Sequence, residues 1–331
     1  MTNPVFEALK KIGVTSEATK ELFNARTRDV EGLKVWKDSQ SGVVFIDDFY
    51  TGDETYVDGD YRDDKAVELK TGKPDFERTN DAQRRFKSNL KFVAGKNIAD
   101  FGCGGGDFLK LVKPFCESVI GIELQQNYVD ELNAVGISCT NNLDSIVDGS
   151  LDAIVSFHVI EHLPNPLDTL TLLKQKVVSG GYVLIEVPHA NDFLLNTVSC
   201  DEFKQFTLWS QHLVLHTRDS LRKTLEYVGL TDVLIEDDLR AYLTAQYADV
   251  GITTTEIDGI IRQLALLSPS DLYESNKTFC KWLSDGFLLK REDPNQKDIY
   301  IQLIDYRDLS LMQHIGEDGS LAAVAESSAH Y

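Results

Sequence analysis

The 331-residue sequence has few cysteines, an excess of acidic over basic residues and no long apolar run. Its five cysteines are scattered, odd in number and never spaced C-x-x-C, which excludes a disulfide framework and a cysteine-ligated zinc site. No stretch approaches the ~18 apolar residues of a membrane span. The first residues, MTNPVFEALKKIG, carry charges inside what would be the apolar core of a signal peptide. We therefore expect a cytoplasmic protein without a membrane span.

Positive charge is scarce along the chain. The 33 lysines and arginines face 53 aspartates and glutamates, which gives a formal net charge of -20. Such a surface repels phosphate backbones and anionic lipids, so nucleic acid and membrane surfaces are poor default partners. The composition favours a small molecule as the substrate.

From about Asn97 onward, short apolar segments alternate with amphipathic ones. The apolar segments have the length of buried strands, and the amphipathic ones have helical spacing. This alternation predicts a doubly wound, mostly parallel α/β fold. We expect a Rossmann-like sheet of seven strands, formed by NIADF, SVIGIEL, ISCT, DAIVSF, YVLIEV, LTDVLIED and one arm of a late hairpin in KDIYIQLIDY.

Residues 1–80 are expected to precede this core as a lid or as the acceptor side. They are predicted to hold two short helices within 4–30, a β-hairpin from KVWKD and GVVFID, and an acidic, tyrosine-rich loop over 47–64. Tyr56 and Tyr61 in that loop are candidates to cover a ligand or bind the substrate. A solvated surface loop is the simpler interpretation.

Residues 239–331 are expected to follow a core that spans 81–238. The stretch over 240–290 has a largely helical pattern, and it precedes the late hairpin and a possible loose tail, LAAVAESSAHY. We expect this C-terminal elaboration to shape the acceptor pocket and to supply the strand that closes the sheet.

The stretch IADFGCGGGDF carries the most specific signal in the chain. A strand ends at about Asp100, glycines follow at alternate positions, and a helix begins near Asp107. Glycine lets the backbone turn sharply and approach a ligand, while the N-terminus of the helix presents free N–H groups. Glu123 ends the next strand, where a carboxylate can accept hydrogen bonds from both hydroxyls of a ribose. A nucleotide-like ligand is therefore expected.

Two cofactors compete for such a loop. A nicotinamide dinucleotide fingerprint has the spacing G-x-G-x-x-G after an apolar strand end. Here the spacing is G-x-G-x-G, and Asp100 stands two residues before Gly102. A carboxylate at that place repels a pyrophosphate but attracts the ammonium and sulfonium groups of S-adenosylmethionine.

DFGCGGG, followed by an acid at the end of the next strand, resembles the first two motifs of class I S-adenosylmethionine-dependent methyltransferases over roughly residues 80–235. The resemblance implies that the glycine loop holds the methionine part, that Glu123 binds the ribose, and that Asn142 and Leu143 contact the adenine. Family members often have an acid at the adenine position, so Asn142 could equally be a turn residue. The residues implied to bind the cofactor are Asp100, Gly102, Cys103, Gly104, Gly106, Glu123, Leu124, Asn142, Leu143, Phe157 and His158.

The stretch FHVIEHL contains His158, Glu161 and His162 in the pattern H-x-x-E-H, which binds zinc on a helix in some peptidases. Pro164 and Pro166 follow almost at once, and DAIVSF leads into the stretch as a strand. A continuous helix through both histidines is therefore improbable. No metal site is predicted.

FHVIEHL resembles instead the fourth motif of the methyltransferases, where a strand ends beside the transferable methyl group. Ligands of open α/β sheets lie beyond the carboxyl ends of the strands. The resemblance therefore implies that Phe157 and His158 lie near the sulfonium. Glu161 and His162 could merely fix the turn by local hydrogen bonds.

Methyl transfer to a hydroxyl requires a group that removes a proton. The stretch WSQHLVLHT places His212 and His216 shortly before a predicted helix. Similar stretches in methyltransferases that act on sugars and surface-polysaccharide precursors carry a histidine there. His212 is thus the first candidate for the general base, followed by His189 and His158, and His216 is assigned to substrate binding. A His212 that packs on Trp209 and bonds to the backbone is the structural alternative.

Sugar C-methyltransferases have an acid beside that histidine, where this chain has Gln211, and a cysteine zinc site that this chain lacks. These departures favour O-methylation of a small hydroxylated acceptor, such as a sugar or polysaccharide precursor. C- or N-methylation of a small metabolite stays open, as does a module that binds the cofactor without turnover.

Overall fold

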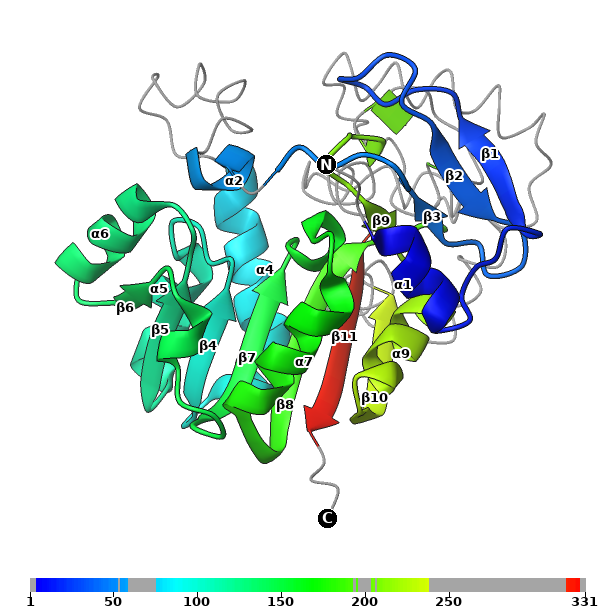
Figure 1. Cartoon of the computed structure of the whole chain (residues 1–331). Coiled ribbons are helices and arrows are strands. Elements are labelled where there is room, and N and C mark those ends of the chain that lie inside the picture. The colour runs from blue at the N-terminus through cyan, green and yellow to red at the C-terminus, as the bar shows by residue number, and fades with distance from the viewer. Residues whose placement is uncertain are drawn as a thin grey trace, which may run out of the picture.

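The computed structural model describes residues 4–52, 54–58, 76–192, 195, 204–205, 207–237 and 320–327. Their strands form a large sheet of seven strands and a small sheet of four. Figure 1 shows helices in front of and behind the large sheet, with the small sheet beyond one end of it. No helix in these ranges has both the length and the apolar character needed to cross a membrane.

The large sheet carries the glycine loop and the stretches that follow it. Its strands are β4 (Asn97–Phe101), β5 (Ser118–Ile122), β6 (Ser138–Thr140), β7 (Leu151–Phe157), β8 (Val177–Pro188), β10 (Leu230–Asp237) and β11 (Ser320–Ser327). Their order is β10-β11-β8-β7-β4-β5-β6. Neighbouring pairs from β6 to β8 are parallel, whereas β11 is antiparallel to β8 and β10. The Rossmann-like, doubly wound α/β fold is confirmed.

Helices cover both faces of this sheet because alternate strand residues are apolar on both sides. They are α4 (Phe76–Val93), α5 (Asp107–Val112), α6 (Gln126–Ala134), α7 (Pro166–Lys176) and α9 (Arg218–Tyr227). Ile98 of β4 packs in a core cluster with Leu109 of α5, whereas the next residue, Ala99, packs in a cluster with Leu170 of α7 and Leu221 of α9. Strands buried on both faces read as continuous apolar runs, and this allowed their prediction.

The N-terminal region forms most of the small sheet, in the order β1-β2-β3-β9. Its elements are α1 (Val5–Lys11), β1 (Lys20–Asn24), β2 (Val35–Asp38), β3 (Val44–Phe45) and β9 (Val214–Leu215). The predicted hairpin is β2 and β3, which pair antiparallel. The second predicted helix is wrong, because the segment around Leu22 and Phe23 pairs with β2 as a strand. Pairing with a neighbour outweighs the weak helix propensity of so short a segment.

The structure describes only parts of the predicted tyrosine-rich loop and of the C-terminal elaboration. Tyr56 lies in a short helix, α2 (Glu54–Asp58), inside the predicted loop. Tyr61, the helical stretch over 240–290 and the late hairpin lie outside the described residues. The predicted loose tail is wrong, because SLAAVAES is β11 and bonds to β8 on one side and β10 on the other (Figure 1). The short apolar run in SLAAVAES is compatible with an inner strand, but so short a run did not by itself predict one.

Candidate functional site

The glycine loop joins the end of β4 to the start of α5. Gly102 and Gly106 have φ angles of 78° and 69°, which L side chains rarely adopt. A Cβ on Gly102 would lie 2.3 Å from a methyl carbon of Val159, and one on Gly106 would lie 2.5 Å from a methyl carbon of Leu132. Both glycines are thus required by backbone conformation and by close packing.

Glu123 follows β5 and holds this loop from the neighbouring strand. One carboxylate oxygen accepts a hydrogen bond from the Gly104 N–H at 2.7 Å, and the other accepts one from the Gln125 N–H at 3.1 Å. The side chain is buried, while the adjacent Leu124 is 49% exposed. Each carboxylate oxygen keeps a further lone pair for a hydroxyl. Glu123, which is predicted to accept hydrogen bonds from the ribose, therefore also positions the loop.

Asp100 lies at the end of β4 and is buried. Burial raises its pKa to about 7, while the positive charge of Arg85 acts to lower it and the negative charge of Glu123 to raise it. A cation beside this carboxyl would stabilise its charged form. The ammonium and sulfonium groups of S-adenosylmethionine fit such a place, whereas a pyrophosphate does not.

The predicted adenine contacts lie after β6. Asn142 precedes the short 3-10 helix η3 (Leu143–Ser145), and its side-chain oxygen accepts a hydrogen bond from the Asp144 N–H at 2.9 Å. Leu143 is partly buried against the core. Asn142 thus makes the turn contact expected from the alternative interpretation.

Two further residues of the predicted cofactor set lie beside the glycine loop. Phe157, at the end of β7, makes an edge contact with Phe108 at 5.0 Å between ring centroids, and Arg85 lies 4.9 Å over its ring. A hydrogen bond with Cys139 and burial raise the pKa of Cys103. Cys103 is therefore a neutral, partly buried side chain of the loop.

A buried ionic group lies next to Phe157, and sequence reasoning missed it. Glu186 of β8 is 2% exposed and accepts hydrogen bonds from both terminal nitrogens of Arg84 at 2.9 Å and from Nε of Arg85 at 2.9 Å. Burial would raise the pKa of Glu186, but the two guanidinium groups hold it well below its ordinary value. Nε2 of His158 lies 3.3 Å from the same carboxylate.

Glu161 lies in η4 (Ile160–His162), the 3-10 turn that follows β7. Its side chain is 0% exposed, and Nδ1 of His158 lies 3.1 Å from Oε1. His158 reaches both Glu161 and Glu186 from a backbone with a φ of 55°, which is rare for a residue other than glycine. Burial would raise the pKa of Glu161, but the hydrogen bond with His158 and the nearby His162 keep it below its ordinary value.

His162 and His212 meet beside Glu161, although 49 residues separate His162 from Gln211, its hydrogen-bond partner. The two rings lie 5.0 Å apart between centroids. One carboxylate oxygen of Glu161 and one ring nitrogen from each histidine lie within 4.8 Å of one another. The pattern H-x-x-E-H thus contributes two of these groups from a turn, and His212 joins them from a distant segment that sequence reasoning did not connect.

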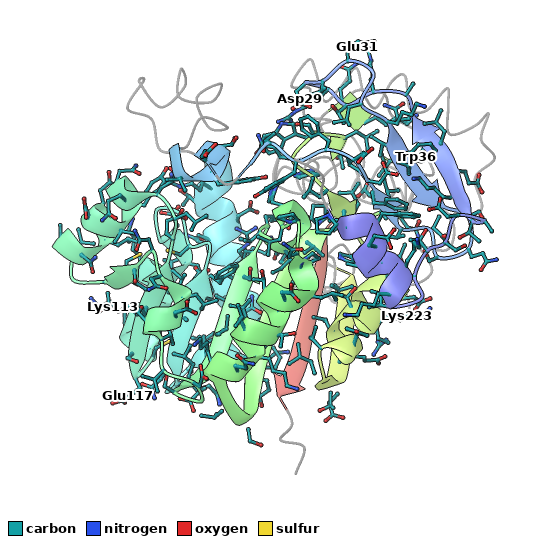
Figure 2. The ribbon with its side chains drawn as sticks, viewed as in Figure 1. Asp29, Glu31, Trp36, Lys113, Glu117 and Lys223 are labelled. Carbon is teal, nitrogen blue, oxygen red and sulfur yellow. The ribbon has the colours of Figure 1, made fainter. Side chains whose placement is uncertain are left out.

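Aromatic rings surround this group. Trp209 makes edge contacts with His162 at 5.9 Å and with His212 at 5.5 Å, and Tyr56 lies 5.9 Å from His162. The segment is anchored by Asp29, which accepts a hydrogen bond from the Ser210 N–H at 3.0 Å. Figure 2 shows Asp29 beyond one end of the large sheet, with Glu117 at the other end.

His212 also makes the contacts expected if its role is structural, which are packing on Trp209 and a hydrogen bond to the backbone. Its Nδ1 lies 2.8 Å from the Thr207 carbonyl oxygen, and its ring packs on Trp209. Burial, followed by the charge of His162, lowers the pKa of His212 to about 3. A base at this position therefore titrates well below the ordinary imidazole pKa.

The remaining predicted histidines lie where β8 ends. The backbones of His189 and His216 form an isolated parallel bridge, and Ala190 N–H donates to the His216 carbonyl at 2.7 Å. His216 is 1% exposed, its ring contacts the Ser220 hydroxyl at 3.0 Å, and burial lowers its pKa to about 4. This interior position at the start of α9 favours a structural role over substrate binding for His216.

The sequence held weak signals for the residues it did not identify. Arg84 and Arg85 are adjacent in an amphipathic helix, where a charged pair is usually solvated. Glu186 interrupts an apolar strand, and a charge in such a strand is a sign of burial with partners. Neither signal names the partner, because the ion pairs join residues about a hundred positions apart.

Residues 77–235 match a sequence family described as a methyltransferase domain. Two curated relatives resemble parts of the chain. A tRNA U34 carboxymethyltransferase of Edwardsiella ictaluri is 32% identical over 31% of this chain and 35% of its own length. A ubiquinone biosynthesis O-methyltransferase of Thiobacillus denitrificans is 27% identical over 33% of this chain and 52% of its own length. The chain thus spans about a third to a half of these relatives.

Among solved structures, a SAM-dependent methyltransferase from Archaeoglobus fulgidus has 18% sequence identity and a TM-score of 0.44, covering 75% of this chain and 94% of that chain. The segment matched by the methyltransferase family, residues 77–235, begins within α4 and ends within β10, so it includes the glycine loop, Asp100 and Glu123. These are the features expected of S-adenosylmethionine as the cofactor. Residues 77–235 are therefore a methyltransferase domain of the S-adenosylmethionine-dependent class.

Proposed function

We propose that this protein transfers a methyl group from S-adenosylmethionine to a hydroxyl of a small acceptor. The observation that carries the proposal is the glycine loop, which is bracketed by Asp100 and Glu123 and packs through Gly102 on Val159. Val159 begins the turn that holds Glu161 and His162. The cofactor loop thus packs on the turn that carries Glu161 and His162.

The cofactor residues divide by the part of S-adenosylmethionine that they suit. Asp100 is placed to pair with a cationic group, and the carboxylate of Glu123 to accept from the ribose hydroxyls. Phe157 and His158 lie at the end of β7, beside the expected position of the sulfonium. The bound cofactor supplies an electrophilic methyl group. Leu124, Asn142 and Leu143 are proposed for the adenine, while Cys103, Gly104 and Gly106 shape the loop.

His212 is proposed to contact the acceptor hydroxyl. A carbonyl oxygen only accepts hydrogen bonds, so the Thr207 carbonyl fixes the proton of neutral His212 on Nδ1 and leaves a lone pair on Nε2. That nitrogen can accept the hydroxyl proton, although its low pKa makes it a weak base. His158 and His189 are the next candidates.

The acceptor is proposed to be a hydroxylated ring, such as a sugar or polysaccharide precursor. Trp209 and Tyr56 place aromatic surfaces beside the polar group, and such surfaces pack against rings. The contact of Tyr56 with His162 also supports an acceptor-side role for residues 1–80, and residues 239–331 are proposed to complete the pocket. The name of the ubiquinone O-methyltransferase relative supports transfer to oxygen. The net charge of -20 argues against a tRNA substrate.

Calorimetry and a product assay test the proposal. S-adenosylmethionine and S-adenosylhomocysteine should bind and raise the melting temperature, because a ligand of the native state stabilises it by mass action. Nicotinamide dinucleotides should give no heat. Incubation with a panel of hydroxylated acceptors should release S-adenosylhomocysteine and yield an O-methylated product. A preference for the dinucleotide would overturn the cofactor, and binding without release across the panel would favour a module without turnover.

A further inference from the structure

Glu161, His162 and His212 form a compact donor group on the acceptor side of the domain. One potential ligand atom from each lies within 4.8 Å of the others, and Nε2 of His162 is 3.8 Å from Oε1 of Glu161. Ligand atoms bound to one ion at ~2.0–2.2 Å lie roughly 3–4 Å apart. Small side-chain rotations would therefore place all three atoms around a single cation.

Both histidines are oriented as metal ligands usually are. Nδ1 of His162 lies 2.8 Å from the Gln211 carbonyl oxygen, and Nδ1 of His212 lies 2.8 Å from the Thr207 carbonyl oxygen. Because a carbonyl can only accept, each neutral ring carries its proton on Nδ1 and its lone pair on Nε2. Hydrogen bonds of this kind fix the tautomer and the ring direction of metal-binding histidines.

Glu161 provides an independent observation. Its side chain is 0% exposed, and within the described part of the chain its Oε2 has no hydrogen-bond partner. Leaving a buried carboxylate oxygen unsatisfied is costly, so such an atom calls for a partner. The other oxygen is held by Nδ1 of His158 at 3.1 Å, as the outer partner of a ligating carboxylate would hold it.

Resting on the proposed function, we propose that Glu161, His162 and His212 bind a divalent transition-metal ion that in turn binds the acceptor hydroxyl. Two imidazoles and one carboxylate suit Zn²⁺, Co²⁺ or Mn²⁺, whereas Mg²⁺ prefers oxygen ligands alone. Three protein ligands leave a position open for the acceptor. With the ion bound, Nε2 of His212 is a ligand and no longer the base, and the ion instead acidifies the hydroxyl, whose proton is released to solvent. The acceptor oxygen then forms a bond to the methyl carbon, and the carbon–sulfur bond breaks with its electron pair left on sulfur.

Metal binding is measured on untagged full-length protein after treatment with a chelator, without cofactor or acceptor. Titration with Co²⁺, followed by its visible absorption and by calorimetry, should give one site per chain that Zn²⁺ displaces. Glu161→Gln should bind Co²⁺ at least ~100-fold more weakly, since loss of a ligand exceeds the ~10–100-fold effect of losing an outer partner. Glu117→Gln removes an exposed carboxylate at the far end of the sheet (Figure 2) and should leave the affinity unchanged.

Circular dichroism establishes that each variant is folded, and S-adenosylhomocysteine binding is measured separately as the readout of the cofactor side. If Glu161→Gln fails to fold, His162→Gln, at a partly exposed position, replaces it with the same expected loss of affinity. Equal Co²⁺ binding by wild type and the folded variant would overturn the proposal, as would a preference for Mg²⁺. Since no cofactor is present, this failure would leave the methyltransferase proposal standing. If the protein binds Co²⁺ but never releases S-adenosylhomocysteine, the proposed function is contradicted while the metal site is not.

Discussion

The cofactor side and the acceptor side of the domain are built in different ways. On the cofactor side, backbone groups and glycines of one loop meet the carboxylate of the next strand, within 24 residues of Asp100. On the acceptor side, Glu161, His162 and His212 come from two segments about fifty residues apart, with His158, Glu186 and two arginines behind them. The first is set by local geometry and the second by burial of charge, so they should respond differently to mutation.

The largest expected effect is on turnover when the acceptor side is altered. His212→Ala should lower the rate of S-adenosylhomocysteine release by ~10²–10⁴-fold, the range for loss of a group that assists removal of the hydroxyl proton. The cofactor affinity of this variant, measured by calorimetry, should stay within about twofold of the wild-type value. Because the pKa of His212 is about 3, ionisation of this residue should not appear in the wild-type rate profile at or above pH 5. Near-normal turnover would remove His212 from the mechanism.

The buried ion pairs behind the acceptor side should matter for stability. Glu186→Gln leaves the guanidinium groups of Arg84 and Arg85 without their buried carboxylate, which should cost ~3–5 kcal/mol of unfolding free energy. Urea denaturation measures this loss. Glu31→Gln is the matched control: it removes an exposed pair with Arg26 and should cost less than ~1 kcal/mol (Figure 2). Similar small losses in both variants would show that the buried pair is not needed for folding.

Acid should destabilise the protein through His216. Its pKa is 6.5 for the ordinary imidazole and about 4 in the fold, so between these pH values the unfolded chain binds a proton that the folded chain does not. This contribution is complete above pH 6.5 and is lost as the pH falls toward 4. When the pH is lowered from 7 to 4.5, the unfolding free energy should therefore fall by about 2–3 kcal/mol more in wild type than in His216→Gln. Equal falls would show that His216 is not buried as a neutral ring.

The cofactor side should show the smallest effect and should not depend on the acceptor side. Glu123→Ala should weaken S-adenosylmethionine binding by ~1.5–3 kcal/mol, the range for hydrogen bonds to a charged group. The fold should survive, because the residue lies just beyond a strand. Unchanged affinity in calorimetry, with a native circular dichroism spectrum, would show that Glu123 is not the ribose ligand.

The same contrast explains what could be predicted from the sequence. The parallel strands, the glycine loop and its two acids are encoded in short contiguous patterns, and all were identified. Strand β1 was mistaken for a helix because its short apolar spacing fits either element, and β11 was mistaken for a tail because its partner β8 is distant in the chain. The grouping of His212 with Glu161 depends on a loop that returns to the sheet by way of the Leu213 N–H and the Glu161 carbonyl, 2.8 Å apart. No local pattern records that contact.

We propose that one side of the domain binds S-adenosylmethionine while the other side binds the acceptor independently. Calorimetry of S-adenosylhomocysteine and Co²⁺ with wild type, Glu123→Ala and Glu161→Gln distinguishes the two sides. We expect Glu123→Ala to lose cofactor affinity and keep that for Co²⁺, and Glu161→Gln to do the reverse. Loss of both affinities in either folded variant, or of neither, would contradict two separable sides.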